Sequence, residues 1–208
     1  MRKKILFLAG MMACSSLAGA QEISKTWVAD KGNGTYQNPV LHADYSDPDV
    51  CAAGDDFYMT ASSFNCIPGI PILHSNDLVN WSLVNYALPI QEPEEFFDKA
   101  QHGKGVWASA IRFHNGEFYI YWGDPDYGIY MIKTKDPKGK WSKPVLVKAG
   151  KGMIDPTPLW DEDGTVYLVH AYAGSRSGVN SIVVICELNG EGTEVISDPV
   201  MVFDGNDG

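Results

Sequence analysis

From Tyr36 onward, short apolar runs alternate with polar clusters along the sequence. The runs are rich in Val, Ile, Tyr, Phe and Trp, and Gly, Asp, Asn and Pro separate them. Runs of this length and composition, bounded by turn residues, are typical of an all-β chain. Residues 92–99 could form one helical turn, but an ordered loop is the favoured interpretation.

The apolar runs repeat as a unit. A tight acidic or glycine turn followed by an aromatic-led strand occurs three times, at residues 54–59, 115–120 and 163–168, and each is a hairpin signal. One strand-like run precedes each hairpin and another follows it, and Trp81 and Trp141 open a fourth run in the first two units. The aligned tyrosines, Tyr58, Tyr119 and Tyr167, are 61 and 48 residues apart. Four-stranded repeats at this spacing indicate the blades of a β-propeller.

Other all-β folds fit less well. A β-sandwich would make the repeats accidental, and the Cys, Trp, Cys spacing of immunoglobulin domains is absent. Only about three blades fit into residues 36–208, whereas a closed ring needs about four or more. We therefore expect the chain to be the N-terminal part of a longer propeller, with residues 203–208 forming a loop after the last strand of the third blade.

Two Asp-Pro pairs mark equivalent places in the first and third units, at Asp47-Pro48 and Asp155-Pro156. A residue before proline is pushed toward extended backbone, so Asp47 is predicted in β or polyproline geometry. Because the innermost strands of a propeller line its channel, Asp47, Trp107-Ala108 and Asp155 are predicted to converge on one pocket. Opposed carboxylates beside an aromatic wall are what glycoside hydrolysis requires. The competing interpretation of each dipeptide alone is a turn.

The N-terminus predicts export. A basic start at residues 2–4, an apolar stretch at 5–13 and small residues at 17–20 indicate a signal peptide over residues 1–20. A lipoprotein signal ending at Cys14 is less well supported, because Met11-Met12-Ala13 matches the usual lipobox poorly. We expect a periplasmic or extracellular protein with no membrane span, and a flexible lead-in over residues 21–35.

The net charge of the chain indicates which classes of molecule it can bind. Without residues 1–20 the net charge falls from −10 to −13, because three basic residues and no acidic ones are removed. So acidic a chain repels nucleic acid and anionic membranes, whereas neutral sugars fit. Cys51, Cys66 and Cys186 are predicted to be buried thiols, with a bridge between the first two as the alternative. No metal-ligand spacing is present, and Arg176 is interpreted as a solvated loop residue rather than a substrate contact.

Six motifs in order resemble glycoside hydrolase family 43, in particular its β-xylosidase and α-L-arabinofuranosidase members, from about Tyr36 to the end. The motifs are Asn38-Pro39-Val40 with Tyr45-Ser46-Asp47-Pro48-Asp49-Val50, Gly54-Asp55-Asp56-Phe57-Tyr58, Ser62-Ser63-Phe64-Asn65-Cys66-Ile67-Pro68-Gly69, His74-Ser75-Asn76-Asp77-Leu78-Val79-Asn80-Trp81, Val106-Trp107-Ala108 and Ile154-Asp155-Pro156.

The resemblance implies a five-bladed propeller, of which this chain supplies about three blades, and an inverting hydrolase of xylan-type or arabinoxylan-type saccharides. By position, Asp47 matches the general base and Asp155 the residue that tunes the acid and orients substrate. Phe64, Trp107 and Ala108 match residues that shape the glycone subsite.

The family's acid is a Glu in a Glu-Gly-Pro motif, which these 208 residues lack. We therefore expect the chain alone to be inactive. The resemblance implies no required cofactor, and any structural calcium in the channel would take its ligands from outside this chain. A non-catalytic carbohydrate-binding propeller is the alternative. The choice between xylose and arabinose, and the oligomeric state, stay open.

Overall fold

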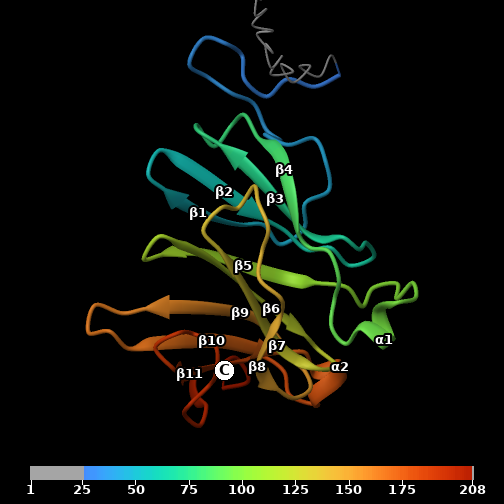
Figure 1. Cartoon of the computed structure of the whole chain (residues 1–208), viewed down its shortest axis with the longest axis vertical. Coiled ribbons are helices and arrows are strands. Elements are labelled where there is room, and N and C mark those ends of the chain that lie inside the picture. Colours follow the sequence, from blue (N-terminus) through green and yellow to red (C-terminus); the bar gives the residue numbers. More distant parts are fainter. Residues whose placement is uncertain (1–25, 208) are drawn as a thin grey trace, which may run out of the picture.

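The computed structural model describes residues 26–207, so the predicted signal peptide and Cys14 lie outside the described part. Three antiparallel sheets of four strands follow one another along the chain (Figure 1). The first contains β1 (Asp49–Ala53), β2 (Asp56–Thr60), β3 (Gly69–Ser75) and β4 (Ser82–Leu88). The second contains β5 (Trp107–His114), β6 (Glu117–Asp124), β7 (Gly128–Thr134) and β8 (Val145–Ala149). The third contains β9 (Met153–Trp160), β10 (Val166–Tyr172), β11 (Ile182–Leu188) and β12 (Val200–Asp204).

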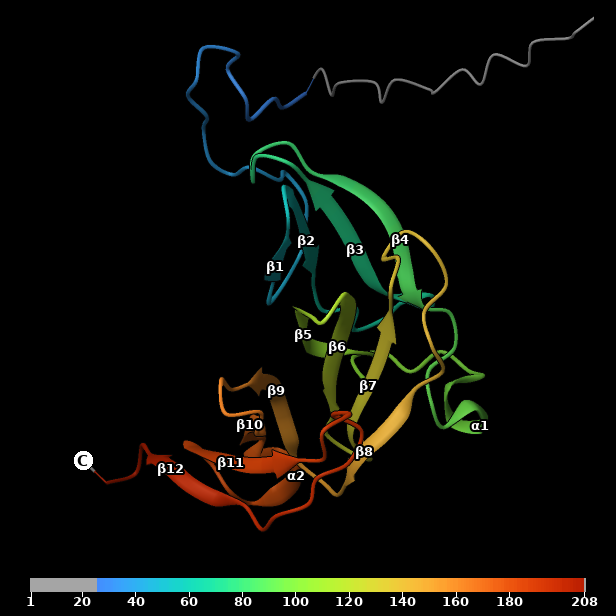
Figure 2. The same cartoon turned by 60° about the vertical axis from the view of Figure 1, so that its left-hand side comes forward.

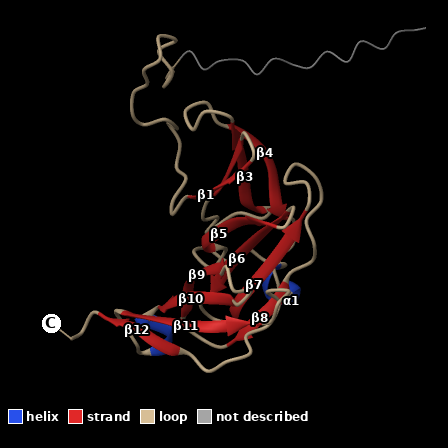
Figure 3. Ribbon diagram, turned by 90° about the vertical axis from the view of Figure 1, so that its left-hand side faces the viewer, coloured by secondary structure: helices blue, strands red, loops and turns tan. Residues whose placement is uncertain are grey.

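Each sheet is a meander in which sequence neighbours pair, which confirms the three predicted repeats of four strands. The predicted hairpins are β1–β2, β5–β6 and β9–β10. The sheets follow an arc with β1, β5 and β9 on its inner side (Figure 3), and these inner strands contact one another in turn. The end of the third repeat was predicted wrongly, because Phe203 and Asp204 belong to β12 and not to a loop.

Two short helices interrupt the connections. The first, α1 (Glu94–Phe97), replaces the loop favoured at residues 92–99, and the second, α2 (Gly174–Ser177), follows β10. Each is a single turn. Within residues 26–207 no helix is long and apolar enough to cross a membrane.

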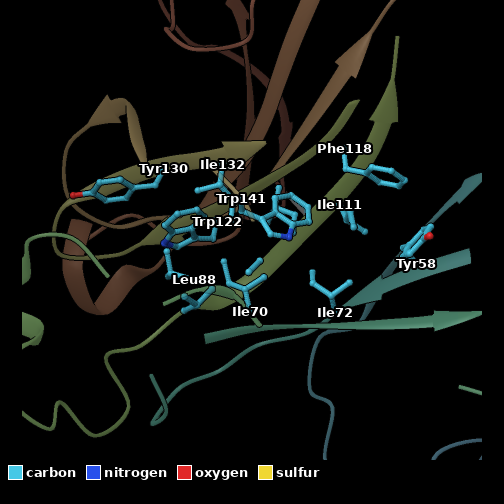
Figure 4. Close-up of a cluster of buried hydrophobic side chains, with 13 residues drawn as sticks. Tyr58, Ile70, Ile72, Leu88, Ile111, Phe118, Trp122, Tyr130, Ile132 and Trp141 are labelled. Atoms are coloured by element: carbon cyan, nitrogen blue, oxygen red, sulfur yellow. The ribbon is translucent and has the colours of Figure 1, made fainter. Parts of the chain in front are cut away.

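The core lies between the sheets. Strand β6 is buried on both faces: Ile120 and Trp122 pack toward the first sheet, and Tyr119 and Tyr121 toward the third. Alternation along one strand therefore serves two separate apolar clusters, which explains the unbroken apolar run of β6. Figure 4 shows the first cluster, in which side chains of β3, including Ile70, meet those of the second sheet.

The connections between strands lie at two opposite ends of the molecule. Because successive strands run antiparallel, the three predicted hairpins lie at one end. The entries to β1, β5 and β9 lie at the other end, together with the β2–β3 and β6–β7 connections (Figure 2). All the sequence-predicted site residues belong to this second end.

Two sequence predictions concern segments outside the sheets. Cys51, Cys66 and Cys186 are free thiols as predicted, but only Cys186 is buried. Cys51 is partly buried, and the predicted burial of Cys66 was wrong, because it is exposed in the β2–β3 connection. In the described part of the lead-in, Asp30 bridges to Tyr36, and the indole of Trp27 donates a hydrogen bond to the Pro39 carbonyl. Flexibility of the lead-in stays a prediction.

Candidate active site

Near the start of each inner strand, one residue other than glycine has a left-handed backbone conformation. Asp47, Ala108 and Asp155 have φ of 50°, 29° and 54°, a left-handed region that residues other than glycine seldom adopt. In the second sheet, Ala108 and Ser109 together face Trp122, since pairing jumps from Trp107↔Gly123 to Ala110↔Tyr121. Two residues against one, with the first left-handed, define a β-bulge, which bends the strand and re-aims a side chain.

The other two sheets repeat the bulge. In the third sheet Asp155 and Pro156 together face His170, between the pairs Ile154↔Ala171 and Thr157↔Val169. In the first sheet the amide of Ser62 donates to the carbonyl of Ser46, and Asp49 pairs with Thr60. Asp47 and Pro48 therefore face Ala61 alone.

The predicted extended backbone at Asp47 is thus wrong. Steric pressure from proline acts on an isolated dipeptide, whereas here the pairing of two strands fixes the conformation. A left-handed residue of this kind costs on the order of 1–3 kcal/mol, which the surrounding structure has to offset. The same strained backbone conformation occurs at equivalent positions in all three sheets. This end of the molecule is therefore the candidate functional site.

Hydroxyl groups hold the carboxylate of Asp47. Ser62 Oγ donates to Asp47 Oδ2 at 2.7 Å, and Ser46 Oγ donates to the same oxygen at 2.9 Å. Ser62 Oγ in turn accepts the backbone N–H of Ala108 at 2.9 Å. Through this contact the second sheet reaches the carboxylate carried by the first. The side chain of Asp47 stays exposed.

Asp155 has different surroundings. Burial raises the pKa of its carboxyl, and repulsion from Asp47 raises it further. The residue is nonetheless exposed to solvent, as Asp47 is. Within residues 26–207 Asp155 accepts no hydrogen bond, so nothing there favours its ionised form. The structure thus brings the two predicted aspartates within electrostatic reach of each other, in unlike environments.

An aromatic pair lies beside the carboxylates. Trp107 opens β5, Phe64 lies in the β2–β3 connection, and their ring centroids are 6.2 Å apart at an interplanar angle of 72°. The Trp107 indole donates to the Gly103 carbonyl at 3.0 Å, which fixes the ring. A pocket of about 290 Å³ opens beside Phe64, with Gln91 and Phe97 in its lining. A larger pocket, about 540 Å³ beside Trp27 and Trp81, contains none of the predicted site residues.

The segment that carries Phe64 is fastened to the entry of β5. Ser63 and Val106 exchange two backbone hydrogen bonds of 2.9 and 3.1 Å, and Gly105 donates to the Phe64 carbonyl at 2.8 Å. Only glycine fits at position 105, because a Cβ there would lie 2.2 Å from the Ser63 oxygen. This close approach sets the distance between the two aromatic rings.

Sequence reasoning missed both serines and a cross-sheet ion pair. Asp49 pairs with the guanidinium of Arg112 and accepts the Ile111 N–H at 2.7 Å, which ties β1 to β5. Asp49 lies two residues after Asp47, and along an unbroken strand the two side chains would face the same way, but the bulge between them breaks the strand period. Both serines lie within motifs that resemble the family, yet the resemblance assigned a role to neither.

The remaining candidates have structural contacts. Arg176 is exposed as predicted, but it lies on α2 and not in a loop, and it forms an ion pair of 3.0 Å with Asp126 in the β6–β7 connection. Residues 161–164 form the β9–β10 turn. Within residues 26–207, no three or more His, Cys, Asp or Glu side chains gather as a metal site would require.

Comparison with known proteins identifies relatives. The family model for glycosyl hydrolases family 43 matches residues 36–207. A β-xylosidase of Formosa agariphila is 32% identical over 97% of this chain and 37% of its own length. A non-reducing end α-L-arabinofuranosidase of Bacteroides ovatus is 36% identical over 65% of this chain and 26% of its own length.

Solved structures agree in fold. The GH43 protein BlXynB from Bacillus licheniformis matches with a TM-score of 0.67 and 31% identity, over 82% of this chain and 34% of that one. Xylan β-1,4-xylosidase from Bacillus halodurans matches with a TM-score of 0.66 and 25% identity, over 82% and 34%. The chain thus spans about a third of the length of the relatives that it matches.

Proposed function

The chain belongs to glycosyl hydrolase family 43, and on this premise we propose that it carries the general base of an inverting hydrolase. The substrates are saccharides that contain xylose or arabinose. The observation behind the proposal is that two neighbouring carboxylates have different surroundings. Asp47 accepts hydrogen bonds from two hydroxyl groups, whereas the carboxyl of Asp155 accepts none within the described residues and has a raised pKa. Environments that separate two carboxyl groups in this way divide acid–base roles between them.

The geometry suggests what each residue does. Asp47 takes a proton from a water molecule as that water attacks the anomeric carbon, and the bond to the leaving oxygen breaks. A Glu beyond these 208 residues donates the proton to that oxygen, and an inverting enzyme keeps base and acid roughly 6.5–9.5 Å apart to admit the water. Asp155 lies near this acid and raises its pKa by like-charge repulsion.

The aromatic pair and Ala108 shape the sugar site. Phe64 and Trp107 offer apolar ring surface to the C–H face of a pentose. Ala108 occupies the bulge position that Asp47 and Asp155 occupy in the neighbouring sheets. Its methyl group leaves room for the sugar ring where a third carboxylate would stand.

The complete fold in this proposal is a five-bladed propeller, of which the three sheets are consecutive blades. Its support here is the uncovered face of the third sheet, where Leu159 is 54% exposed, and the outer strand β12, where Val200 and Phe203 are each 61% exposed. Further blades would cover such surface. We extend the proposal to export from the cytoplasm and to a mechanism without a cofactor.

The test uses the full-length protein with aryl β-xyloside and aryl α-L-arabinofuranoside. Asp47→Asn is expected to lower kcat by a factor on the order of 10² or more, as loss of a positioned base does, without a change in unfolding temperature. Asp44→Asn is the matched control, because Asp44 is exposed and unbonded within the described residues. A wild-type protein that turns over neither substrate, yet binds xylo-oligosaccharide, would instead support a non-catalytic binding propeller.

A further inference from the structure

Ser62 has no role assigned by the sequence motif that contains it, yet it joins two sheets at Asp47. We propose that Ser62 is a positioning residue that fixes Asp47 through Oδ2 and leaves Oδ1 as the oxygen that accepts the proton. The inference rests on the proposed function, because it concerns how the base of that reaction is held.

The two oxygens of Asp47 differ. Oδ2 accepts both serine hydroxyls, at 2.7 Å from Ser62 and 2.9 Å from Ser46. Within residues 26–207, Oδ1 accepts no hydrogen bond. An ionised carboxylate has about four lone-pair sites, so the two on Oδ2 are used and those on Oδ1 are free. With the residue exposed, Oδ1 is the oxygen to which a water molecule has access.

The direction of the Ser62 hydrogen bond is determined by its second partner. A serine hydroxyl has one proton to donate. Ser62 Oγ accepts the N–H of Ala108 at 2.9 Å, so its own proton is directed at Asp47. That N–H is available because Ala108 lies in the bulge, where pairing between β5 and β6 is interrupted. The second sheet therefore orients the proposed base through the Ser62 hydroxyl, whereas Ser46 donates to the same oxygen without a link to the second sheet.

The third sheet supplies an internal comparison. It has the same bulge at Asp155, and the residues that correspond to Ser46 and Ser62 are Ile154 and Ala171, which pair across it. Neither side chain has a hydroxyl. The carboxylate of Asp155 accordingly accepts no hydrogen bond within the described residues, and burial together with repulsion from Asp47 raises its pKa. The same backbone thus carries one carboxylate that hydroxyl groups hold and one that they do not.

Removing the Ser62 hydroxyl is expected to lower kcat more than it changes KM. Without the hydroxyl the Asp47 carboxylate loses the hydrogen bond that links it to the second sheet. It then samples unproductive orientations, which lowers kcat, whereas KM changes little because in this proposal Ser62 acts through Asp47.

The experiment measures kcat and KM for full-length Ser62→Ala, Ser62→Thr, Ser62→Cys and Ser46→Ala with an aryl glycoside. For Ser62→Ala we expect a fall in kcat of about tenfold or more, as for loss of a hydrogen bond to a charged group. Ser62→Thr keeps the hydroxyl and should restore most of the rate. Ser62→Cys keeps the size with a weak donor and should fall between them. Ser46→Ala should have the smaller effect, because the link from Ala108 remains.

Two outcomes would overturn the inference. One is an unchanged kcat in Ser62→Ala, or in Ser62→Cys if Ser62→Ala does not fold. The other is a loss of rate in Ser62→Ala that is matched by a rise in KM and does not recover in Ser62→Thr, which indicates a structural role only. Wild type and Asp47→Asn are assayed in parallel. If these two behave as proposed while the Ser62 variants behave like wild type, only the inference fails, whereas an inactive wild type removes both.

Discussion

Gly105→Ala tests whether the close backbone approach beside Phe64 holds the aromatic pair together. The added Cβ would lie 2.2 Å from the Ser63 oxygen and 2.7 Å from the Phe64 oxygen. Both atoms are backbone, so no side-chain rotation can relieve the contact. Ordinary van der Waals contact begins near 3.4 Å, so the two segments have to separate by roughly 1 Å, as expected in a close-packed structure.

The cost follows from the hydrogen bonds in this place. Three backbone bonds of 2.8 to 3.1 Å join residues 63–64 to 105–106, and a separation of that size takes them beyond hydrogen-bonding distance. At about 1 kcal/mol each, their loss costs about 3 kcal/mol. Overpacking in a well-packed site typically costs a similar 1–3 kcal/mol. Phe64 also moves away from Trp107, so we expect KM for the glycoside to rise.

The assay is urea unfolding of the full-length protein, followed by steady-state kinetics at a temperature at which the variant is folded. Gly190→Ala is the matched control, because a Cβ there meets nothing within 4 Å and the backbone is not left-handed. We expect Gly105→Ala to lose about 3 kcal/mol relative to this control. Equal stability and equal KM in the two variants would refute the reasoning.

Two further predictions concern Asp155 and Asp124, the carboxyls whose pKa is raised. Asp155→Asn should move the alkaline limb of the pH–rate profile to lower pH, because the acid loses a neighbouring negative charge; an unmoved limb would count against the tuning role. Asp124→Asn should stabilise the protein at neutral pH but not near pH 4. Burial raises the pKa of the Asp124 carboxyl, so its ionisation costs stability as pH rises from about 3.8 through the raised folded value. Urea unfolding at both pH values decides, and a variant no more stable than wild type at pH 7 would contradict this account.

The fold could be predicted because its signals lie within short stretches of the sequence. The hairpin at Asn115-Gly116 could be predicted because a two-residue turn of this kind and the alternation of its strands are encoded within about ten residues. The backbone at Asp47 could not, since steric preference before proline is also local but is overridden by pairing with residues 60–62. The sequence contains both partners of that pairing, but it does not show that they meet.

Some residues of the candidate site could likewise be predicted from the sequence, and others could not. Asp47 and Asp155 were found because Asp-Pro recurs at equivalent places, and Phe64 and Trp107 because their motifs resemble a family. Ser62 was missed because its significance depends on the N–H of Ala108, 46 residues later in the chain.

Equivalent positions in a repeat suggest equivalent functions, but the two aspartates at these positions have different surroundings. Asp47 and Asp155 share a bulge, a left-handed φ and a following proline, yet only one is held by hydroxyl groups. The decisive positions are the paired neighbours across the bulge, which are Ser46 and Ser62 in the first sheet and Ile154 and Ala171 in the third. The repeated backbone places a carboxylate near the start of an inner strand, and the residues that pair beside it decide whether hydroxyl groups hold that carboxylate. In the proposed function, one structural unit thus supplies both the base and the tuning residue, and the two copies differ in the side chains that flank the bulge.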